Sequence, residues 1–347
     1  MAYTTVDNPE LYFQTKLYTG NGGTQAITLD GSENMQPDWT WLKCRSNLES
    51  HELYDAVRGA TKMISSNLTN AETTKSTALT SFNSDGFTLG SNFEVNASGR
   101  TFAAWNWLAG GSASSNTDGD VTASVSANTT AGFSIVKFTS SSSSGAMTVG
   151  HGLGATPKMV IVKDIGATGN WQVYFEGIGT ANQQYLKLNA TDAVVNYSGL
   201  WGAGMTSSVI GIGVGVAVDA NESDIAYCFA EKKGYSKFGK YTGNGNADGP
   251  FVYTGFRPAW VLQKNTGATQ GWQLQDNKRL GYNPDNYLLQ PHTTQSESAL
   301  QRVDLLSNGF KVRTTDAGQN SSGTTYIYAA FAESPFVNSN GVPTNAR

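Results

Sequence analysis

The chain has 347 residues, of which 39% are hydrophobic and 14% charged, and its formal net charge is −4. This length suits two or three domains, and 39 glycines among many Ser, Thr and Asn residues favour short strands and tight turns over long helices. Two cysteines are too few for a disulfide scaffold, no apolar run reaches the roughly 18 residues of a membrane-spanning helix, and no Lys/Arg run suggests a nucleic-acid partner.

The first third of the chain contains several recognisable segments. Residues 12–22 are typical of a strand that enters a Gly/Asn turn, and residues 37–43 of a strand that starts at a proline, where proline is tolerated. Residues 71–81 have a spacing that a helix could use, and the sequence leaves that helix open. Residues 103–107 predict a closing strand, with Trp105 and Trp107 on one face.

The same landmarks return twice in the same order. In the later copies they are residues 133–139 and 235–245, 157–163 and 258–264, and 226–231 and 328–333. Lys43, Lys163 and Lys264 each end the strand that begins at a proline, and Trp171 and Trp272 follow their lysines at the same distance. Internal repetition at this spacing indicates three tandem copies of one module.

We therefore predict an all-β chain of three tandem antiparallel β-sandwich modules, jelly-roll or lectin-like, of about 100 residues each. The expected domains are residues 1–116 with an N-terminal attachment segment, residues 117–234 and residues 235–347. The tryptophans that recur at the landmarks are expected in the core: Trp39, Trp41, Trp105, Trp107, Trp171 and Trp272.

Candidate catalytic residues are few. The sequence has three histidines, His51, His151 and His292, and no Gly-x-Ser-x-Gly elbow or Cys/His cluster. We expect His51 to be a polar surface residue that could pair with Asp55. Most acids lie in turn contexts, so we predict no enzyme, no cofactor and no metal site. A carboxylate pair for glycoside hydrolysis stays open, because its members need only meet in space.

Three aromatic residues are candidates for ligand binding. Trp201 lies in a glycine-rich loop and has no counterpart in the other copies, so its ring could stack on a sugar, anchor a neighbouring subunit or plug its own core. Tyr282 and Tyr287 flank a similar loop in the third copy.

Several strings carry a family resemblance. They are Tyr-Thr-Gly-Asn-Gly at 18–22 and 241–245, Pro-x-Trp-x-x-x-Lys at 37–43 and 258–264, Asp-Ala-Val-Arg-Gly-Ala at 55–60, Ser-Asp-Gly-Phe-Thr-Leu-Gly at 84–90 and Ala-Trp-Asn-Trp at 104–107. Together they resemble a family of uncharacterised repeat proteins of tailed bacteriophages, common in marine and cyanobacterial phages and described as tail-fibre-like or virion structural proteins. The second copy departs most, at its opening turn of residues 140–145. The resemblance implies no catalytic residues.

This resemblance implies a bacteriophage virion structural protein, foremost a tail-fibre or adhesin subunit that binds a host-surface glycan or receptor. The alternatives are a purely architectural protein, such as a capsid decoration or tail connector, and a glycan-degrading enzyme. The expected partners are other virion proteins, further copies of the chain in a homo-oligomer and a host-surface glycan, without nucleic acid or membrane insertion. The first residues lack the pattern of a secretory signal, so we expect synthesis in the host cytoplasm and a place in the virion. Stringing sandwiches would give such a protein stability and reach.

Overall fold

The computed structural model describes residues 3–179, 183–280, 283 and 285–344. Strands in its sheets pair antiparallel, which confirms the all-β prediction. The helical elements in the described ranges are the 3-10 helix η1 (Pro9–Leu11) and α1 (Phe93–Asn96). Across those ranges, no helix has the length and apolar character needed to cross a membrane.

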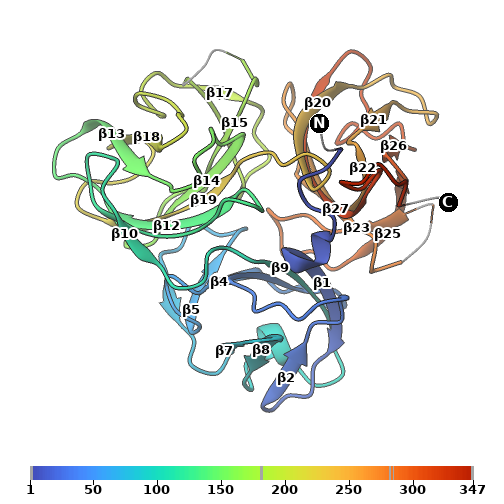
Figure 1. Ribbon diagram of the computed structural model, residues 1–347, viewed down its shortest axis with the longest axis horizontal. Helices are drawn as coiled ribbons and strands as arrows, with labels where there is room; N and C mark the ends of the chain where they lie inside the picture. The colour runs from blue at the N-terminus through green and yellow to red at the C-terminus, as the bar shows by residue number, and fades with distance from the viewer. Residues whose placement is uncertain (1–2, 180–182, 281–282, 284, 345–347) are drawn as a thin grey trace.

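The strands form three lobes, which we name by their order in the chain and which surround a common centre (Figure 1). The first lobe contains β1 (Phe13–Thr19), β2 (Gln25–Thr28), β3 (Trp39–Cys44), β4 (His51–Asp55), β5 (Lys62–Ser65), β6 (Thr73–Thr74), β7 (Leu79–Asn83), β8 (Gly86–Leu89) and β9 (Thr101–Trp107). The second contains β10 (Ser114–Asn116), β11 (Ala123–Asn128), β12 (Phe133–Thr139), β13 (Gly145–Gly150), β14 (Met159–Asp164), β15 (Gln172–Phe175), β16 (Gln184–Lys187), β17 (Val195–Asn196), β18 (Val209–Val214) and β19 (Ser223–Phe229). The third contains β20 (Ser236–Thr242), β21 (Phe251–Tyr253), β22 (Phe256–Asn265), β23 (Gln273–Asp276), β24 (Asp285–Leu288), β25 (Ser298–Leu306), β26 (Gly309–Val312) and β27 (Thr325–Pro335).

The order of strands repeats from lobe to lobe. A large sheet places β1, β9, β3 and β4 side by side, and the orders β12-β19-β14-β15 and β20-β27-β22-β23 repeat it. A second sheet pairs β2 with β8, β13 with β18 and β21 with β26 in the three lobes. The repeat in the sequence is therefore also a repeat in structure.

The segment of residues 71–81 does not form a helix. β6 and the start of β7 lie there instead. The charged residues that suggested helical spacing instead contact β4 and the turn that follows it, because Lys75 Nζ lies 2.7 Å from Glu52 Oε1 and Glu72 Oε2 lies 3.2 Å from Arg58 Nη1.

The large sheets of all three lobes share one central apolar core. Its buried aromatic members include Trp39, Trp41, Trp105 and Trp107 from the first lobe, Phe133, Trp171, Tyr227 and Phe229 from the second, and Trp260, Trp272 and Phe331 from the third. The rings of different lobes touch, since Trp39 stacks on Tyr227 at 4.5 Å and Trp107 meets Trp260 at 5.6 Å between ring centroids. The prediction that the recurring tryptophans are core residues is confirmed.

Each lobe also has an outer core between its large and its second sheet. In β14, Met159 and Ile161 enter the central core, while Val160 and Val162 enter the outer core of the second lobe. Successive side chains of a strand point to opposite faces of the sheet. A strand that lies between two cores therefore carries apolar side chains on both of its faces. This explains the continuous apolar run at residues 159–162.

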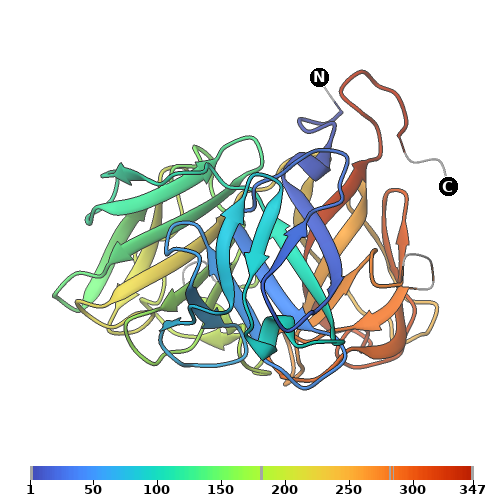
Figure 2. The same cartoon turned by 90° about the horizontal axis from the view of Figure 1, so that it is seen from below.

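The lobes are consequently not strung out along the chain. The expectation that tandem modules would give reach is wrong, because the central core requires all three large sheets to face one another. Viewed from below, the molecule is a single broad body with both ends of the chain on one side (Figure 2).

Two of the three contacts between lobes carry a buried Asp–Arg pair. Asp55 accepts from Arg58 Nε at 2.5 Å and from the Tyr227 hydroxyl of the second lobe at 2.7 Å. In the third lobe Asp276 accepts from Arg279 Nε at 2.6 Å and from Trp105 Nε1 of the first lobe at 3.0 Å. Each carboxylate is buried but well supplied with donors, as a buried charge requires.

The third contact, between the second and third lobes, has an apolar residue where the other two have the aspartate of the Asp–Arg pair. Phe175 ends β15 where Asp55 ends β4 and Asp276 ends β23. Its ring meets Phe238 of the third lobe with 6.4 Å between centroids. The threefold repeat is therefore broken where the second and third lobes meet.

The three lysines that mark the repeat are buried near these contacts. Lys43 donates to the carbonyl of Thr294 in the third lobe at 3.1 Å, and Lys264 to that of Thr191 in the second lobe at 3.1 Å. Lys163 donates to carbonyls of its own lobe, among them that of Asp164. Burial lowers the pKa of each ammonium group to about 8.

Replacing Tyr227 by Phe removes the hydroxyl that links the second lobe to Asp55 while the ring keeps its stacking on Trp39. We expect a loss of about 2 kcal/mol in the free energy of unfolding, because a hydrogen bond to a charged group contributes about 1.5–3 kcal/mol. Tyr235→Phe is the matched control, since the buried Tyr235 hydroxyl has no hydrogen-bond partner in the described residues. Equal losses in denaturant titrations of the two variants would contradict this account.

The three buried lysines should make stability rise with pH between about 8 and 10.5. The folded lysine pKa values of about 8 lie below the ordinary value of 10.5, so between these values the unfolded chain binds more protons than the folded chain. We expect Lys264→Met to be less stable than wild type and to gain less stability between pH 7.5 and 9 in urea titrations. Lys62→Met, at a partly exposed lysine, should keep the wild-type slope. The same slope in Lys264→Met as in wild type would contradict the assignment.

Candidate functional site

The polar residues that recur between lobes hold the fold together. Besides the buried lysines, Asn96 and Asn320 anchor the Gly/Asn turns of the first and third lobes. The amide of Asn96 donates to the Gly23 carbonyl and that of Asn320 to the Asn246 carbonyl, each at 2.7 Å. The motifs that the lobes share therefore have roles in holding the fold together. A binding site is best sought among residues that occur in one lobe alone.

Two of the three histidines, His51 and His151, are buried and take no part in an open site. The prediction that His51 lies on the surface is wrong, because its ring is buried and its Nδ1 accepts from Trp41 Nε1 at 2.9 Å. Burial keeps the pKa of His51 well below its ordinary value. His51 lies opposite Lys43 in the paired strands β3 and β4. It occupies the position that Trp171 and Trp272 have relative to Lys163 and Lys264. The expected partner of His51, Asp55, binds Arg58 instead. His151 is also buried, and its Nδ1 accepts from the Leu153 amide at 3.2 Å.

Two places in the described residues bring carboxyl groups close together in largely buried surroundings. Asp164 and Asp224 are opposite each other in β14 and β19 and both are buried. Burial and the charge of Asp164 raise the pKa of Asp224 to about 8. Burial likewise raises the pKa of Glu52, which shares Lys75 with Glu94, to about 7.

Metal ligands are not grouped in the part of the chain that the structure describes. No three His, Cys, Asp or Glu side chains there are placed to hold a metal ion. Cys44 and Cys228 are buried free thiols in the outer cores of the first and second lobes.

Trp201 does not present its ring to a ligand. The side chain is fully buried in the outer core of the second lobe, where its ring lies 5.7 Å from Tyr174 and its Nε1 donates to the Gln184 carbonyl at 3.0 Å. The interpretation as a stacking platform is therefore wrong, and the ring plugs its own lobe. Tyr287 is half-buried on β24 of the third lobe, so the structure does not bring it to Trp201. Tyr282 lies outside the described residues.

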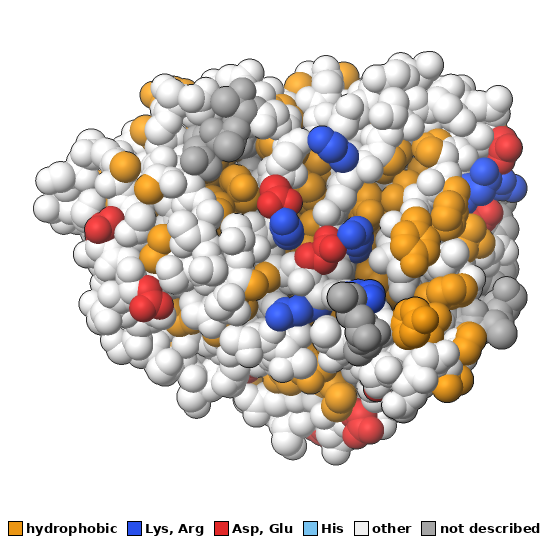
Figure 3. Space-filling model, turned by 45° about the horizontal axis from the view of Figure 1, so that its top comes forward, with side chains coloured by type: hydrophobic (Ala, Val, Ile, Leu, Met, Phe, Trp, Pro, Cys, Tyr) orange, Lys and Arg blue, Asp and Glu red, His pale blue; other side chains and the backbone are white. Residues whose placement is uncertain are grey.

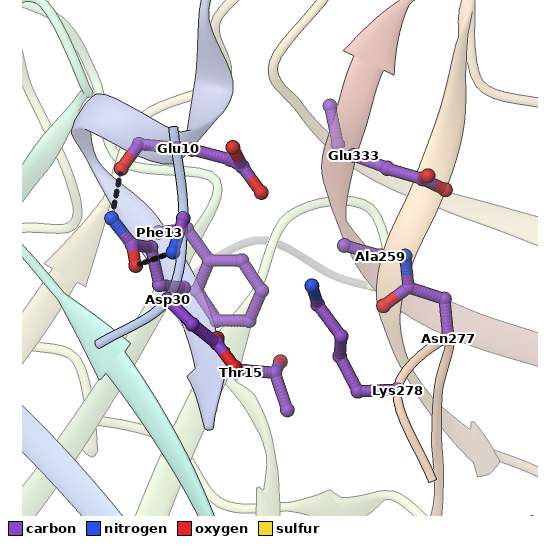
Figure 4. Close-up of a pocket in the computed structure, with 11 residues that line it drawn as sticks. Glu10, Phe13, Thr15, Asp30, Ala259, Asn277, Lys278 and Glu333 are labelled. Carbon is purple, nitrogen blue, oxygen red and sulfur yellow. Dashed lines mark hydrogen bonds between the residues drawn. The ribbon is translucent and has the colours of Figure 1, made fainter. Parts of the chain in front are cut away.

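A polar pocket lies on the seam between the first and third lobes (Figure 4). Glu10, Phe13 and Asp30 line one wall, and Lys278 and Glu333 the other. Its volume of about 50 Å³ has room for a few waters at most, since one water needs roughly 10–15 Å³ of such space. We regard it as a hydrated seam.

A larger pocket lies where the two ends of the described chain meet. It has a volume of about 250 Å³, and its walls include Tyr3, Glu231, Lys233, Lys237, Tyr253 and Phe336. The N-terminal segment is held there by Thr4, whose hydroxyl donates to the Lys233 carbonyl at 2.9 Å. The C-terminal segment is held by the Phe336 amide, which donates to the Gly255 carbonyl at 3.2 Å. The pocket therefore combines both ends with the connection between the second and third lobes.

Two exposed aromatic rings, those of Tyr3 and Tyr253, line this pocket, and a third lies on the same strand as Tyr253. Tyr3 is 58% exposed and Tyr253 is 59% exposed, while Phe251 is 46% exposed. Phe251 and Tyr253 are two residues apart on β21, so they point to the same face at a spacing of about 7 Å, with Val252 buried between them. We call Tyr3, Phe251, Tyr253 and the adjoining pocket the aromatic site.

The aromatic site occurs in one lobe only. In the first lobe, β2 pairs with β8 as β21 pairs with β26, and its outward positions are Ala26 and Thr28 where the third lobe has Phe251 and Tyr253. Small residues at these positions fit the fold equally well. The aromatic rings are thus not required by the packing that the lobes share.

Basic side chains adjoin the rings. Lys233 Nζ lies 5.8 Å from the centroid of the Tyr3 ring, within range of a cation–π contact. Lys237 Nζ lies 2.8 Å from Glu231 Oε1 on the pocket wall. In Figure 3, hydrophobic side chains gather on the right of the view, beside Lys and Arg side chains that are interspersed with Asp and Glu. Apolar ring faces and lysine side chains thus lie next to each other at this site.

One part of this site, the pair of aromatic residues on β21, is visible in the sequence. Residues 251–253 place two aromatic residues at alternate positions of one short strand. Alignment of β21 with β2 would have shown them as additions to the common pattern. Tyr3 and Phe336 had no such signal, because only the folded chain brings its two ends together.

Residues 8–335 match a protein family described as Domain of unknown function (DUF7483). The chain belongs to this family. The match spans all three lobes and includes Phe251 and Tyr253, while Tyr3 and Phe336 lie outside it. No curated protein matches the chain. Membership therefore identifies the three lobes as one recurring unit and assigns no activity to it.

Substitutions should separate the buried tryptophan from the exposed tyrosine. We expect Trp201→Ala to lower the free energy of unfolding by about 3–5 kcal/mol, the usual cost of removing a buried aromatic ring. Tyr253→Ala should change it by less than about 0.5 kcal/mol, because the ring is mostly exposed. Denaturant titration measures both. A small loss for Trp201→Ala would mean that its ring does not fill the core.

Proposed function

We propose that this protein is a carbohydrate-binding structural protein of a bacteriophage virion, and that the aromatic site is its sugar-binding surface. The observation that carries the proposal is the group of exposed rings, Tyr3, Phe251 and Tyr253, beside a pocket. Exposed aromatic clusters on a soluble protein mark interaction sites. Tyrosine presents a flat apolar face and a polar tip, which suits the C–H face and the hydroxyls of a sugar ring.

We interpret the lobes as three β-sandwich modules, with domains at residues 1–116, 117–234 and 235–347. The separate outer cores between the two sheets of each lobe support this interpretation. The central core then joins the modules into one rigid carrier, on which the strand β21 holds its rings at a fixed spacing. A preorganised surface of this kind loses little entropy on binding.

A binding role fits the site better than glycoside hydrolysis. Hydrolysis needs two carboxyl groups about 5–10 Å apart on either side of a bound sugar. In the pocket, Glu231 is the acid among the residues that line it, and it is engaged by Lys237 and by the Phe238 amide. The pocket offers contacts for recognition rather than an acid and a nucleophile.

The place in a virion is supported by the motifs that resemble tailed-phage proteins and by the rigid three-lobed body. One observation favours the architectural alternative, in which the aromatic site contacts another virion protein. The two ends of the described chain meet beside this site, where the Ser339 amide donates to Asp7 Oδ1 at 2.7 Å. A neighbouring protein joined near either end would lie close to the exposed rings.

Binding of the labelled full chain to an array of bacterial surface glycans and to candidate host cells tests the proposal. We expect saturable binding by the wild type and at least about a fivefold loss in Tyr253→Ala, because stacking of a planar base on an aromatic ring contributes about 1–3 kcal/mol and a sugar face uses the same kind of contact. Tyr197→Ala is the matched control, since Tyr197 is 52% exposed and belongs to the second lobe.

The outcomes separate the alternatives. Unchanged binding in Tyr253→Ala would place the ligand elsewhere on the protein. No binding by folded wild-type protein to any glycan or cell would overturn the sugar-binding function and favour the architectural role.

A further inference from the structure

A partly exposed ion pair forms the polar wall of the pocket in the aromatic site. Lys237 Nζ lies 2.8 Å from Glu231 Oε1, and the two side chains are 38% and 28% exposed. The second Glu231 oxygen accepts from the Phe238 amide at 3.2 Å. The pair is therefore held in place at the start of the third lobe, and a ligand in the pocket can still reach both groups.

Both groups of this ion pair keep hydrogen-bonding capacity. An ammonium group has three N–H donors, and a carboxylate has about four acceptor sites on its two oxygens. In the part of the chain that the structure describes, the contacts of the pair use one donor of Lys237 and two acceptor sites of Glu231. Free donors and acceptors thus remain side by side. Two neighbouring hydroxyl groups match this arrangement, because each hydroxyl can both donate and accept.

The other charged side chains at the site also have partners. On the far flank of β21, Asp248 lies 2.8 Å from Lys311 Nζ. Lys233 Nζ lies over the Tyr3 ring at 5.8 Å from its centroid. An anion brought to the site would have to compete with Glu231 and Asp248 for the lysines, and both carboxylates would repel it. A neutral ligand with hydroxyl groups meets neither obstacle.

The size of the pocket suits one sugar unit rather than a chain. Its volume of about 250 Å³ lies just below the roughly 300–1,000 Å³ of pockets that enclose drug-sized ligands. Tyr3 and Phe336 contribute walls from the two ends of the described chain, and Tyr253 contributes one from β21. Phe251 lies on the same strand but does not line the pocket. A longer ligand can therefore fill the pocket with one unit and continue over Phe251.

We propose that the pocket holds the terminal unit of a neutral glycan, with its ring against Tyr253, two neighbouring hydroxyl groups hydrogen-bonded to Glu231 and Lys237, and the next unit stacked on Phe251. This inference rests on the proposed function and specifies its ligand. Alternate residues of a strand point to the same face about 7 Å apart, so β21 sets the direction in which the glycan leaves the pocket. The ion pair selects the sugar, and Phe251 adds affinity for longer chains.

The test uses the full chain on an array of mono-, di- and trisaccharides in neutral, carboxylated and sulfated forms, followed by calorimetric titration with the saccharides that bind. The variants are Glu231→Ala/Lys237→Ala and Phe251→Ala. The matched control is Lys158→Ala/Glu176→Ala, which removes a Lys–Glu pair of the second lobe at 2.6 Å, with side chains 33% and 48% exposed. Exposed ion pairs contribute little to stability, and thermal unfolding establishes that each variant is folded.

We expect the bound saccharides to be neutral, with affinities that change little between about 50 and 300 mM NaCl, because salt screens only charged ligands. Monosaccharide affinity should fall at least about tenfold in Glu231→Ala/Lys237→Ala, since hydrogen bonds to charged groups are the stronger kind. Phe251→Ala should keep monosaccharide affinity within about twofold of wild type and lower that for di- and trisaccharides at least about fivefold. The control should bind as the wild type does.

Other outcomes overturn the inference in distinct ways. Binding restricted to carboxylated or sulfated saccharides would refute the neutral ligand and leave the sugar-binding function standing. Binding of neutral saccharides that needs Tyr253 but neither Glu231 nor Lys237 would refute the role of the ion pair. Equal losses for mono- and trisaccharides in Phe251→Ala would refute the direction of the chain. An array with no bound saccharide would overturn the function and this inference together.

Discussion

The central apolar core is the constraint on which the rest of the structure depends. It is formed by the inward faces of three large sheets, and each sheet covers the other two. The tryptophans of the central core are buried jointly, because rings of the first lobe contact Tyr227 and Trp260 of its neighbours. Burial of apolar area supplies most of the free energy of folding. Removal of one lobe would therefore expose the inner faces of the remaining two.

The same constraint separates residues that carry the fold from residues that carry function. Inward positions of the large sheets contact other lobes, and turns are held by buried lysines and asparagines. The outward positions of short strands such as β21 touch no other lobe, so they can change without disturbing the core. Phe251 and Tyr253 occupy such positions. The structure thus admits new surface chemistry in one lobe while the shared interior stays unchanged.

Much of the fold could be predicted from the sequence, and the reason lies in the repeat. Proline-led strands, their terminal lysines and the paired tryptophans recur in order, so strand identity and core membership could be inferred by comparison of the copies. The arrangement of the lobes could not be inferred, because a run apolar on both faces is equally consistent with a strand between two sheets of one module. His51 illustrates a further limit, since the sequence does not show that its imidazole packs against the rings of Trp41 and Trp105.

The candidate site was less accessible to sequence reasoning. Trp201 is unique to its copy, yet uniqueness does not distinguish an exposed ring from one that fills a lobe-specific gap, and the structure shows the second. The exposed rings of β21 could have been found by aligning it with β2, where Ala26 and Thr28 stand. Tyr3 could not, because its neighbours Lys233 and Gly341 are far away in the chain.

The contact at Phe175 distinguishes one of the three contacts between lobes from the other two. A buried carboxylate held by several donors fixes the angle between two bodies, because hydrogen bonds are directional. Aromatic packing tolerates small rotations, since apolar attraction depends little on direction. The contact between the second and third lobes has no such carboxylate at this position, although hydrogen bonds such as that from Lys264 Nζ to the Thr191 carbonyl also cross it. The segment of residues 230–235 that spans this contact also borders the aromatic site, so a ligand held there would lie beside the contact that has Phe175 in place of a buried Asp–Arg pair.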